Sequence, residues 1–401
     1  MSTQVTLRSL GVRVYLPSLL YGVGQGAIAP IVALSARDLG ASVGSASLVV
    51  AAAGVGQLVG DLPAGALAGR IGERRAMLAA SALVVGALGA CMLASTEWLL
   101  AVGIFCTGLA GAVWGLARQA YLAEVVPFHL RARAMSTLGG VQRIGMFIGP
   151  FLGALAVGVW GTDGAYGLHA TTAVLAGLLL LALPEPAHAG RAAPAGGPVR
   201  TIDVARSHAS VLRTLGMGAL LVGAVRASRQ VVIPLWADSI GLDAASTSVI
   251  FGIAGSVDML LFYPAGRVMD RKGRAFVAVP SMVILGLAHL LLPMTNHAVT
   301  LAGVAVLMGF GNGIGSGIIM TLGADVSPPV GRTAFLGAWR LCADAGNSAG
   351  PLVIGAVSAT VALGPAVLLM GGVGLVGAVL MGRWIPRHPP GPAPQPVPHS
   401  P

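Results

Sequence analysis

The chain has 401 residues, of which 55% are hydrophobic and only 9% are charged. A soluble domain usually carries about 25% charged residues, so this chain has too few charges to cover a water-exposed surface. The mean hydropathy of +0.84 points the same way, and the composition predicts a polytopic membrane protein. The net charge of +10 does not indicate nucleic-acid binding, because the basic residues stand between apolar runs.

A bilayer core about 30 Å thick needs roughly 20 apolar residues per helix. Twelve such runs are predicted, at residues 12–36, 44–68, 75–95, 97–122, 135–159, 166–184, 212–237, 245–268, 275–293, 297–323, 334–360 and 364–384. If both termini are cytoplasmic, every basic residue of a predicted loop except Arg37 faces the cytoplasm, as the positive-inside rule requires. The prediction is an all-α membrane protein with twelve transmembrane helices and both termini cytoplasmic.

The sequence repeats itself at an offset of 201 residues, and Pro and Arg matches at one fixed offset are not expected by chance. The matched pairs include Gly65 and Gly266, Arg70 and Arg271, Gly72 and Gly273, Gly149 and Gly350, and Pro150 and Pro351. The repeat predicts two pseudo-symmetric six-helix bundles. Their expected bounds are 1–184 and 212–385, joined by a cytoplasmic linker at 185–211 and followed by a disordered, Pro-rich tail at 386–401.

Two short motifs mark the chain. The first follows the second predicted helix, where Gly69 and Gly72 are expected to allow a sharp turn, and it returns after the eighth. The second lies in the fifth helix at residues 145–153, where glycines at four-residue spacing let helices approach closely and a proline bends the helix. The residues that we assign to these conformational motifs are Gly65, Arg70, Gly72, Arg74, Gly149, Pro150, Gly266, Asp270, Arg271 and Gly273.

On these motifs and on the repeat, the whole chain resembles the major facilitator superfamily, whose loop pattern is roughly G-x-x-x-D-R-x-G-R-R. The second copy keeps the acid as Asp270, whereas the first copy has Gly69 at that position. In the family this acid is thought to help latch the two halves together on the cytoplasmic side. The 145–153 motif resembles that of proton-coupled exporters, and generic tight helix packing is the alternative interpretation.

Ionisable side chains at bilayer depth are costly, so each is a candidate functional residue. The resemblance implies that the fifth helix packs against the eighth and the second against the eleventh. This arrangement predicts an Arg143–Asp258 pair and an Asp61–Arg340 pair between the halves. The alternative for Arg340 is local, because Asp344 lies four residues away on the same helix. We assign proton or ion-pair coupling to Asp61, Arg143, Asp258, Arg340 and Asp344.

The remaining polar groups in the spans are candidates for a central cavity. Arg226 and Arg229 lie three residues apart on one face of the seventh helix and leave the embedded charges net positive. That surplus favours an anionic or zwitterionic group in the cavity, unless carboxylates or carbonyls of the chain satisfy both arginines. The predicted cavity residues are Tyr21, Gln25, Trp114, Arg226, Arg229 and Asn312, and for Trp114 we favour core packing over a direct role.

The function predicted from these features is secondary active transport, by proton-coupled export of a small organic or amphipathic compound with alternating access. The alternatives are uptake or facilitated transport of an organic anion and, in another class, a non-transporting sensor or lipid-handling protein. We expect no enzyme activity, no cofactor and no metal site. The expected partners are a small-molecule substrate, protons and the lipid bilayer, without nucleic acid, and the protein is expected to be a monomer in a bacterial inner (plasma) membrane.

Overall fold

The structure is a computed structural model that describes residues 14–126, 128–182, 204, 206–328 and 332–388. Within these residues it contains helices and no strand. The N-terminal helices are α1 (Leu16–Ile28), α2 (Ile31–Asp38), α3 (Val43–Ile71), α4 (Glu73–Met92), α5 (Glu97–Val125), α6 (Phe128–Trp160) and α7 (Thr162–Leu181). The predicted helices of this half therefore exist, with ends that differ from the expected ones by a few residues in most cases.

The C-terminal part begins with α9 (Ala209–Val211) and a π-helical turn at Leu212–Gly216. The helices that follow are α10 (Met217–Ser239), α11 (Ala244–Lys272), α12 (Ala275–Leu291), α13 (Ala298–Ile314), α14 (Ile318–Asp325), α15 (Arg332–Thr360) and α16 (Leu363–Trp384), with 3-10 turns at Leu292–Met294 and Ile385–Arg387. The last turn overlaps the start of the tail that was expected to be disordered. Most of the predicted linker, and the tail beyond residue 388, lie outside the described residues.

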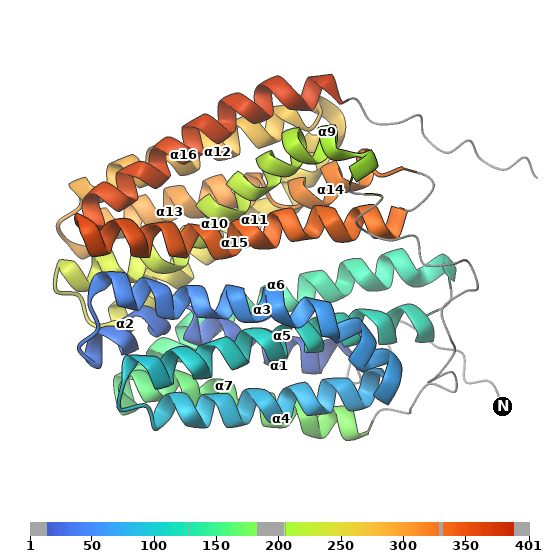
Figure 1. The fold of residues 1–401 in the computed structure, drawn as a ribbon. Helices are drawn as coiled ribbons and strands as arrows, with labels where there is room; N and C mark the ends of the chain where they lie inside the picture. The colour runs from blue at the N-terminus through green and yellow to red at the C-terminus, as the bar shows by residue number, and fades with distance from the viewer. Residues whose placement is uncertain (1–13, 127, 183–203, 205, 329–331, 389–401) are drawn as a thin grey trace, which may run out of the picture.

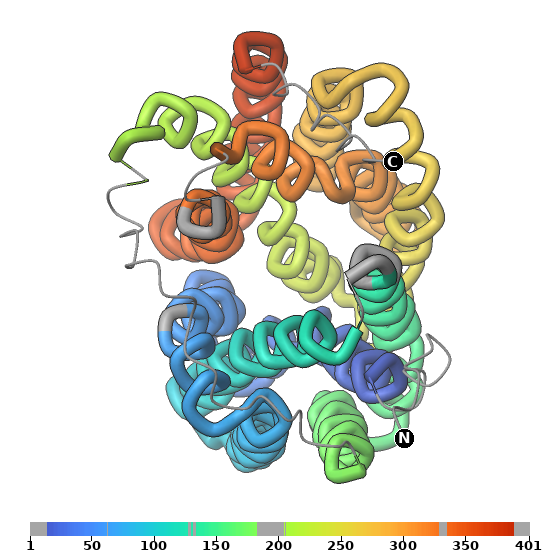
Figure 2. The backbone as a smooth tube through the Cα atoms, turned by 90° about the vertical axis from the view of Figure 1, so that its right-hand side faces the viewer, coloured from blue at the N-terminus to red at the C-terminus, as the bar shows by residue number. Residues whose placement is uncertain are grey.

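The helices form two groups that lie one above the other in Figure 1, with α1–α7 below and α9–α16 above. Figure 2 shows the same two groups from one end of the helices. The helix contacts within one group match those within the other. Helix α1 packs on α6 as α10 packs on α15, α3 packs on α5 as α11 packs on α13, and α4 packs on α7 as α12 packs on α16. Between the groups, α3 contacts α15 and α6 contacts α11, which confirms the two expected helix pairings.

Ten helices of the described part are long and apolar enough to cross a membrane, and the pair α1 and α2, bent by 43°, would make an eleventh. Helix α15 has 29 residues, as many as α11, but it is not among them. It carries Arg340 and Asp344 and packs against α3 and α10. The structure therefore describes a multi-span helical protein, and the count of twelve spans stays a prediction.

Two spans that were expected to be continuous are interrupted. Pro30 follows the end of α1, and the chain resumes at α2 after the bend. Between α13 and α14, Gly317 has φ +81°, a left-handed conformation that ends one helix and starts the next. The sequence of the apolar run at 297–323 did not predict this second break. The run contains several glycines, and the sequence does not indicate which of them has a non-helical backbone conformation.

The loop motif makes its turn at one glycine per copy. Gly72 and Gly273 have φ of +87° and +89° with extended ψ, a region of the Ramachandran plot that is essentially restricted to glycine. The expectation that Gly69 shares this role is wrong, because Gly69 lies inside α3. The tight turn needs one residue without a Cβ atom, and the helix continues regularly up to Ile71.

The glycines of the 145–153 motif bring α6 into backbone contact with α1. A Cβ atom on Gly149 would lie 2.4 Å from the carbonyl oxygen of Val23, and one on Gly145 would lie 2.4 Å from that of Leu19. The second half repeats this contact, because a Cβ atom on Gly350 would lie 2.2 Å from the carbonyl oxygen of Ala224. Tight helix packing within each half is thus what these glycines do in the structure.

We predict that Gly149→Ala lowers the stability of the protein by about 1–3 kcal/mol, because the added methyl group overpacks a backbone contact. The matched control is Gly158→Ala on the same helix, where an added Cβ meets nothing within 4 Å. The measurement is the thermal unfolding midpoint of each purified variant in detergent. Equal midpoints for the two variants would contradict the packing role of Gly149.

Candidate functional site

Arg340 joins the two groups of helices. Its guanidinium lies 3.6 Å from Asp61 on α3 and 3.3 Å from Asp344 on its own helix α15. The two carboxylates have 14% and 13% of their side chains exposed, whereas the side chain of Arg340 is 49% exposed. The predicted Asp61–Arg340 contact is therefore present, and so is the local alternative, because one arginine holds both carboxylates.

A second ion pair between the groups lies at the far end of the helices. Arg37, near the C-terminus of α2, lies 3.0 Å from Asp238 near the C-terminus of α10, and it also donates a hydrogen bond to the Ala41 carbonyl oxygen. The two residues are separated by 201 positions, so they occupy equivalent places in the two repeats. Both side chains are about one-third exposed, so the pair is accessible to solvent.

Glycines on the four contacting helices show where the groups touch. Near the Arg37–Asp238 pair, Cβ atoms on Gly44 and Gly252 would lie 2.7 Å from Ala359 and 2.9 Å from Phe151, each in the other group. At the opposite end, which we call the arginine-rich end because it carries Arg74 and Arg274, the glycines of these helices meet nothing within 4 Å; they are Gly65, Gly69, Gly139, Gly140, Gly266 and Gly337. The groups are therefore in contact near the Arg37 end, and the glycines of the arginine-rich end make no such contact with described residues.

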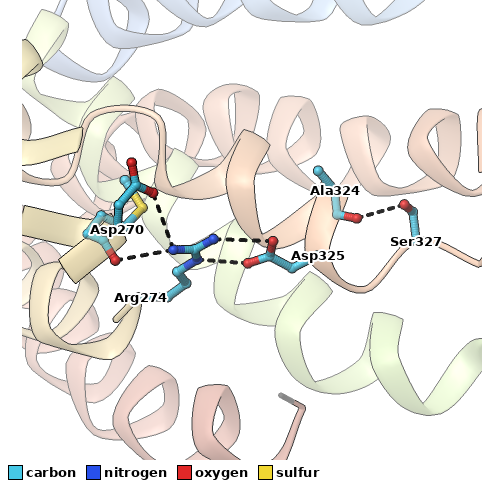
Figure 3. A network of polar contacts seen from close by, with 6 residues as sticks. Asp270, Arg274, Ala324, Asp325 and Ser327 are labelled. Carbon is cyan, nitrogen blue, oxygen red and sulfur yellow. Dashed lines mark hydrogen bonds and ion pairs between the residues drawn. The ribbon is translucent and has the colours of Figure 1, made fainter. Parts of the chain in front are cut away.

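At the arginine-rich end, the second loop motif forms a network inside its own half (Figure 3). Arg274 donates two hydrogen bonds to Asp325, at 2.8 Å and 3.4 Å, one to the Met269 carbonyl oxygen, and one to Asp270 at 3.5 Å. These bonds to Asp325 raise the pKa of Arg274 above its usual value. Asp270 thus contributes to a contact among α11, α12 and α14, and among the described residues its ion-pair partner lies in its own half.

The first copy of the motif has a different chemistry. Gly69 and Glu73 stand where the second copy has Asp270 and Arg274, so the same network cannot form. Arg74 instead donates to the carbonyl oxygens of Leu180 and Leu181 at the end of α7, at 3.1 Å and 2.6 Å. Of the other motif residues, Arg70, Gly65, Gly266 and Arg271 are exposed or partly exposed.

The predicted Arg143–Asp258 pair is not formed in this structure. Within the described residues, no ion pair shorter than 4.0 Å joins them; Arg143 donates a hydrogen bond to the Ser316 hydroxyl and lies over the ring of Phe262, 4.1 Å from its centre. Asp258 accepts a hydrogen bond from the side chain of Asn312. The contact between halves is kept, but it runs from α6 to the break between α13 and α14, which the sequence did not indicate.

Five predicted residues of the second half and the interface do come together. Asn312 lies between Asp258, which its amide contacts, and Arg226, which donates to its carbonyl oxygen at 3.4 Å. Arg229 is 8% exposed and donates no hydrogen bond to any described residue. All three arginines, Arg143, Arg226 and Arg229, are within electrostatic range of the single Asp258 carboxylate.

The predicted cavity residues of the first half form a packed cluster. The rings of Tyr21 and Trp114 stack with centres 4.3 Å apart, and both residues are at most 2% exposed. The guanidinium of Arg118 lies 4.9 Å from the centre of the Trp114 ring and donates to Gln142, which in turn reaches Gln25 at 3.4 Å. Core packing is thus confirmed for Trp114, while Gln25 is only partly buried.

Sequence reasoning missed two partners in these clusters, Gln142 and Ser316. Each accepts a hydrogen bond from an arginine that lies at bilayer depth. Neither residue is charged, so a search limited to ionisable groups passes over it. Gln142 directly precedes Arg143 in the sequence, and this position is the signal that could have found it. Adjacent residues of a helix point in directions about 100° apart, so Gln142 and Arg143 contact different neighbours.

We predict that Arg37→Gln loosens the closed end of the helices. Ser47 is fully buried on α3, and a Cβ atom on Gly355 of α15 would lie 3.2 Å from its Cβ atom. A Ser47→Cys thiol, in a background without the three native cysteines, should react about two- to fivefold faster with a water-soluble maleimide once the ion pair is lost. Arg383→Gln removes an exposed charge at the other end and serves as the control. If the Ser47→Cys thiol reacts at the same rate with Arg37 intact, in Arg37→Gln and in Arg383→Gln, the ion pair does not hold this end closed.

Comparison with known proteins agrees with this architecture. The tetracycline resistance protein, class C, of Escherichia coli is 29% identical over 318 residues, which cover 74% of this chain and 76% of that protein. The chloramphenicol resistance protein of Streptomyces lividans is 27% identical over 336 residues, covering 83% and 84%. Among solved structures, a bacterial homologue of the human lysosomal transporter Spinster, in an inward-facing conformation, superposes with a TM-score of 0.81 at 14% identity, covering 98% and 100%.

The sequence model of one family accounts for nearly the whole chain. It matches residues 14–329 and, in a second overlapping match, residues 215–399. Together with the helical architecture and its repeated contacts, these matches show that the chain belongs to the Major Facilitator Superfamily of membrane transporters.

Proposed function

We propose that this protein exports a small organic or amphipathic compound across a bacterial inner membrane in exchange for protons, by alternating access. The observation that carries the proposal is the guanidinium of Arg340, which holds one carboxylate on each side of the α3–α15 contact. The relatives support the direction of transport, because their names describe resistance to tetracycline and chloramphenicol.

The coupling step in this proposal is protonation of the Asp61–Asp344 pair. A proton removes one negative charge from Arg340, and this weakens the attraction that crosses from α15 to α3. Two carboxyl groups near one guanidinium can hold a single proton between them, as carboxylate pairs commonly do. Asp258 becomes the less favoured proton carrier, because its hydrogen bond is to Asn312 and Arg143 contacts Ser316 instead.

The same proposal gives the membrane topology. The two units, 1–184 and 212–385, would each have six spans, with both termini and the arginine-rich end in the cytoplasm. Helix α15 would be a further span although it is less apolar than the others, since its charges face α3 rather than lipid. Open space beside the glycines of the arginine-rich end supports an inward-facing conformation, like that of the structurally similar Spinster homologue.

One observation favours a second candidate, transport of an organic anion. Three arginines lie within electrostatic range of one carboxylate, Asp258, so this part of the interface carries a positive surplus. An anion facilitator would depend on Arg226 or Arg229 and would move its substrate without a proton. The exporter is preferred, because a carboxyl pair on one bridging arginine has a clear use in proton coupling.

We predict that Asp61→Asn and Asp344→Asn each lower compound-driven proton movement at least about tenfold, since an amide cannot take up a proton at neutral pH. The assay uses purified protein in sealed liposomes that contain a pH-sensitive dye, with tetracycline, chloramphenicol and a lipophilic cation added in turn. The control is Asp243→Asn: Asp243 caps α11 in a loop, and asparagine caps helices equally well.

The outcomes separate the candidates. Proton movement in the wild type and in Asp243→Asn, but not in Asp61→Asn or Asp344→Asn, would support coupled export. Full proton movement in both buried variants would remove the Arg340 carboxylates from the mechanism. Equilibration of a labelled anion without any proton movement would favour the facilitator. Thermal unfolding midpoints of all variants show whether a loss of transport reflects misfolding.

A further inference from the structure

Partly or fully buried charged residues from both groups of helices lie near the break between α13 and α14. Arg143 comes from α6, Arg226 and Arg229 from α10, and Asp258 from α11. Arg143 bonds to Ser316 within the break itself, and Arg226 bonds to the carbonyl oxygen of Asn312 just before it. The charges sum to three positive and one negative, so the cluster keeps two uncompensated positive charges at a depth where charge is costly.

Several polar atoms of this cluster have no partner among the described residues. They are Nε of Arg226, Nε of Arg229 and Oδ1 of Asp258, all of them buried. A buried donor or acceptor without a hydrogen bond is destabilising, and such atoms are rare in folded proteins. Arg229 is the clearest case, because the residue is only 8% exposed and its Nε–H is buried without an acceptor among the described residues.

The two repeats differ near the α13–α14 break, and the difference makes room for the guanidinium of Arg226. Trp114 of the first half corresponds to Gly315 of the second, and Gln25 corresponds to Arg226. A Cβ atom on Gly315 would lie 2.8 Å from a terminal nitrogen of Arg226 and 2.1 Å from the Ser281 hydroxyl. Where the first half is filled by a stacked indole ring, the second half has a glycine and a guanidinium beside it. The exchange therefore replaces an apolar filling with a group that binds oxyanions.

We propose that the cluster of Arg143, Arg226 and Arg229 beside Asp258 binds a carboxylate or similar oxyanion of the transported molecule. The inference rests on the proposed transport function and specifies its substrate class. A planar guanidinium matches a carboxylate with two parallel hydrogen bonds, which a neutral amide cannot reproduce with the same strength. Since Arg143 belongs to one group of helices and the other two arginines to the second, a bound anion lies between the groups that move.

Asp258 limits this affinity. It is the negative charge within electrostatic range of all three arginines, and its hydrogen bond to Asn312 keeps it beside the break. An incoming anion is attracted by three charges and repelled by one. Removing the repulsion should therefore strengthen anion binding, whereas removing Arg226 or Arg229 should weaken it. A gain of binding cannot be produced by misfolding, so the two directions together test the proposal.

The test is ligand-induced stabilisation of the purified full-length protein in detergent. Benzoate is the probe and benzamide its neutral match, both at constant ionic strength. A ligand that binds the folded state raises the unfolding temperature according to its concentration and Kd. Benzoate should raise the midpoint of the wild type and of the control Arg383→Gln, and benzamide should not. Arg226→Gln and Arg229→Gln should lose the benzoate shift, and Asp258→Asn should bind benzoate about tenfold more tightly.

Equal shifts with benzoate and benzamide in the wild type, including no shift with either, would overturn the proposal. An undiminished benzoate shift in Arg229→Gln would overturn it as well. This result is independent of proton coupling, because binding is measured without a membrane gradient. If benzoate binds at the arginines but tetracycline, chloramphenicol and the lipophilic cation move no protons in the liposome assay, the oxyanion site stands and the exporter mechanism fails.

Discussion

The interface between the two groups of helices depends on one guanidinium, which contacts carboxylates on both sides of the α3–α15 contact. The Arg340 side chain is about half exposed, at 49%, whereas the two carboxylates that it contacts are mostly buried and need a compensating positive charge. Arg340 meets this requirement for Asp61 on α3 and Asp344 on α15, so the polar face of α15 has to lie against α3. This accounts for a helix that is too polar for a lipid-facing position and yet as long as its apolar neighbours.

The two halves share helix contacts but differ in chemistry. In the first half, Tyr21 stacks on Trp114, and a chain of polar groups runs from Arg118 to Gln25. In the second half, glycine and arginine occupy the positions of Trp114 and Gln25. Duplication thus preserved the packing, which depends on glycines at matched positions, while the surfaces facing the interface diverged. A ligand between them would meet the partly buried amides of Gln25 and Gln142 on one side and arginines on the other.

The sequence predicted most of what helix periodicity and the repeat determine. Helix positions, the α3–α15 and α6–α11 contacts and the Asp61–Arg340 pair follow from apolar run length, from the offset of 201 residues and from the family resemblance. It did not predict the break at Gly317 or the Arg143 bond to Ser316. A long side chain chooses its partner among several within reach, and that choice depends on local backbone geometry, which hydropathy does not describe.

Arg37 and Asp238 form an ion pair although they occupy the same position in the two copies of the repeat. Equivalent residues of two copies can contact each other only near the axis that relates the copies. Two identical copies would therefore bring arginine against arginine, or aspartate against aspartate, at this point, and the like charges would repel. The contact required the copies to become different in charge at this one position. A dimer of either half alone could form the helix packing but would be pushed apart where the fused chain is held together.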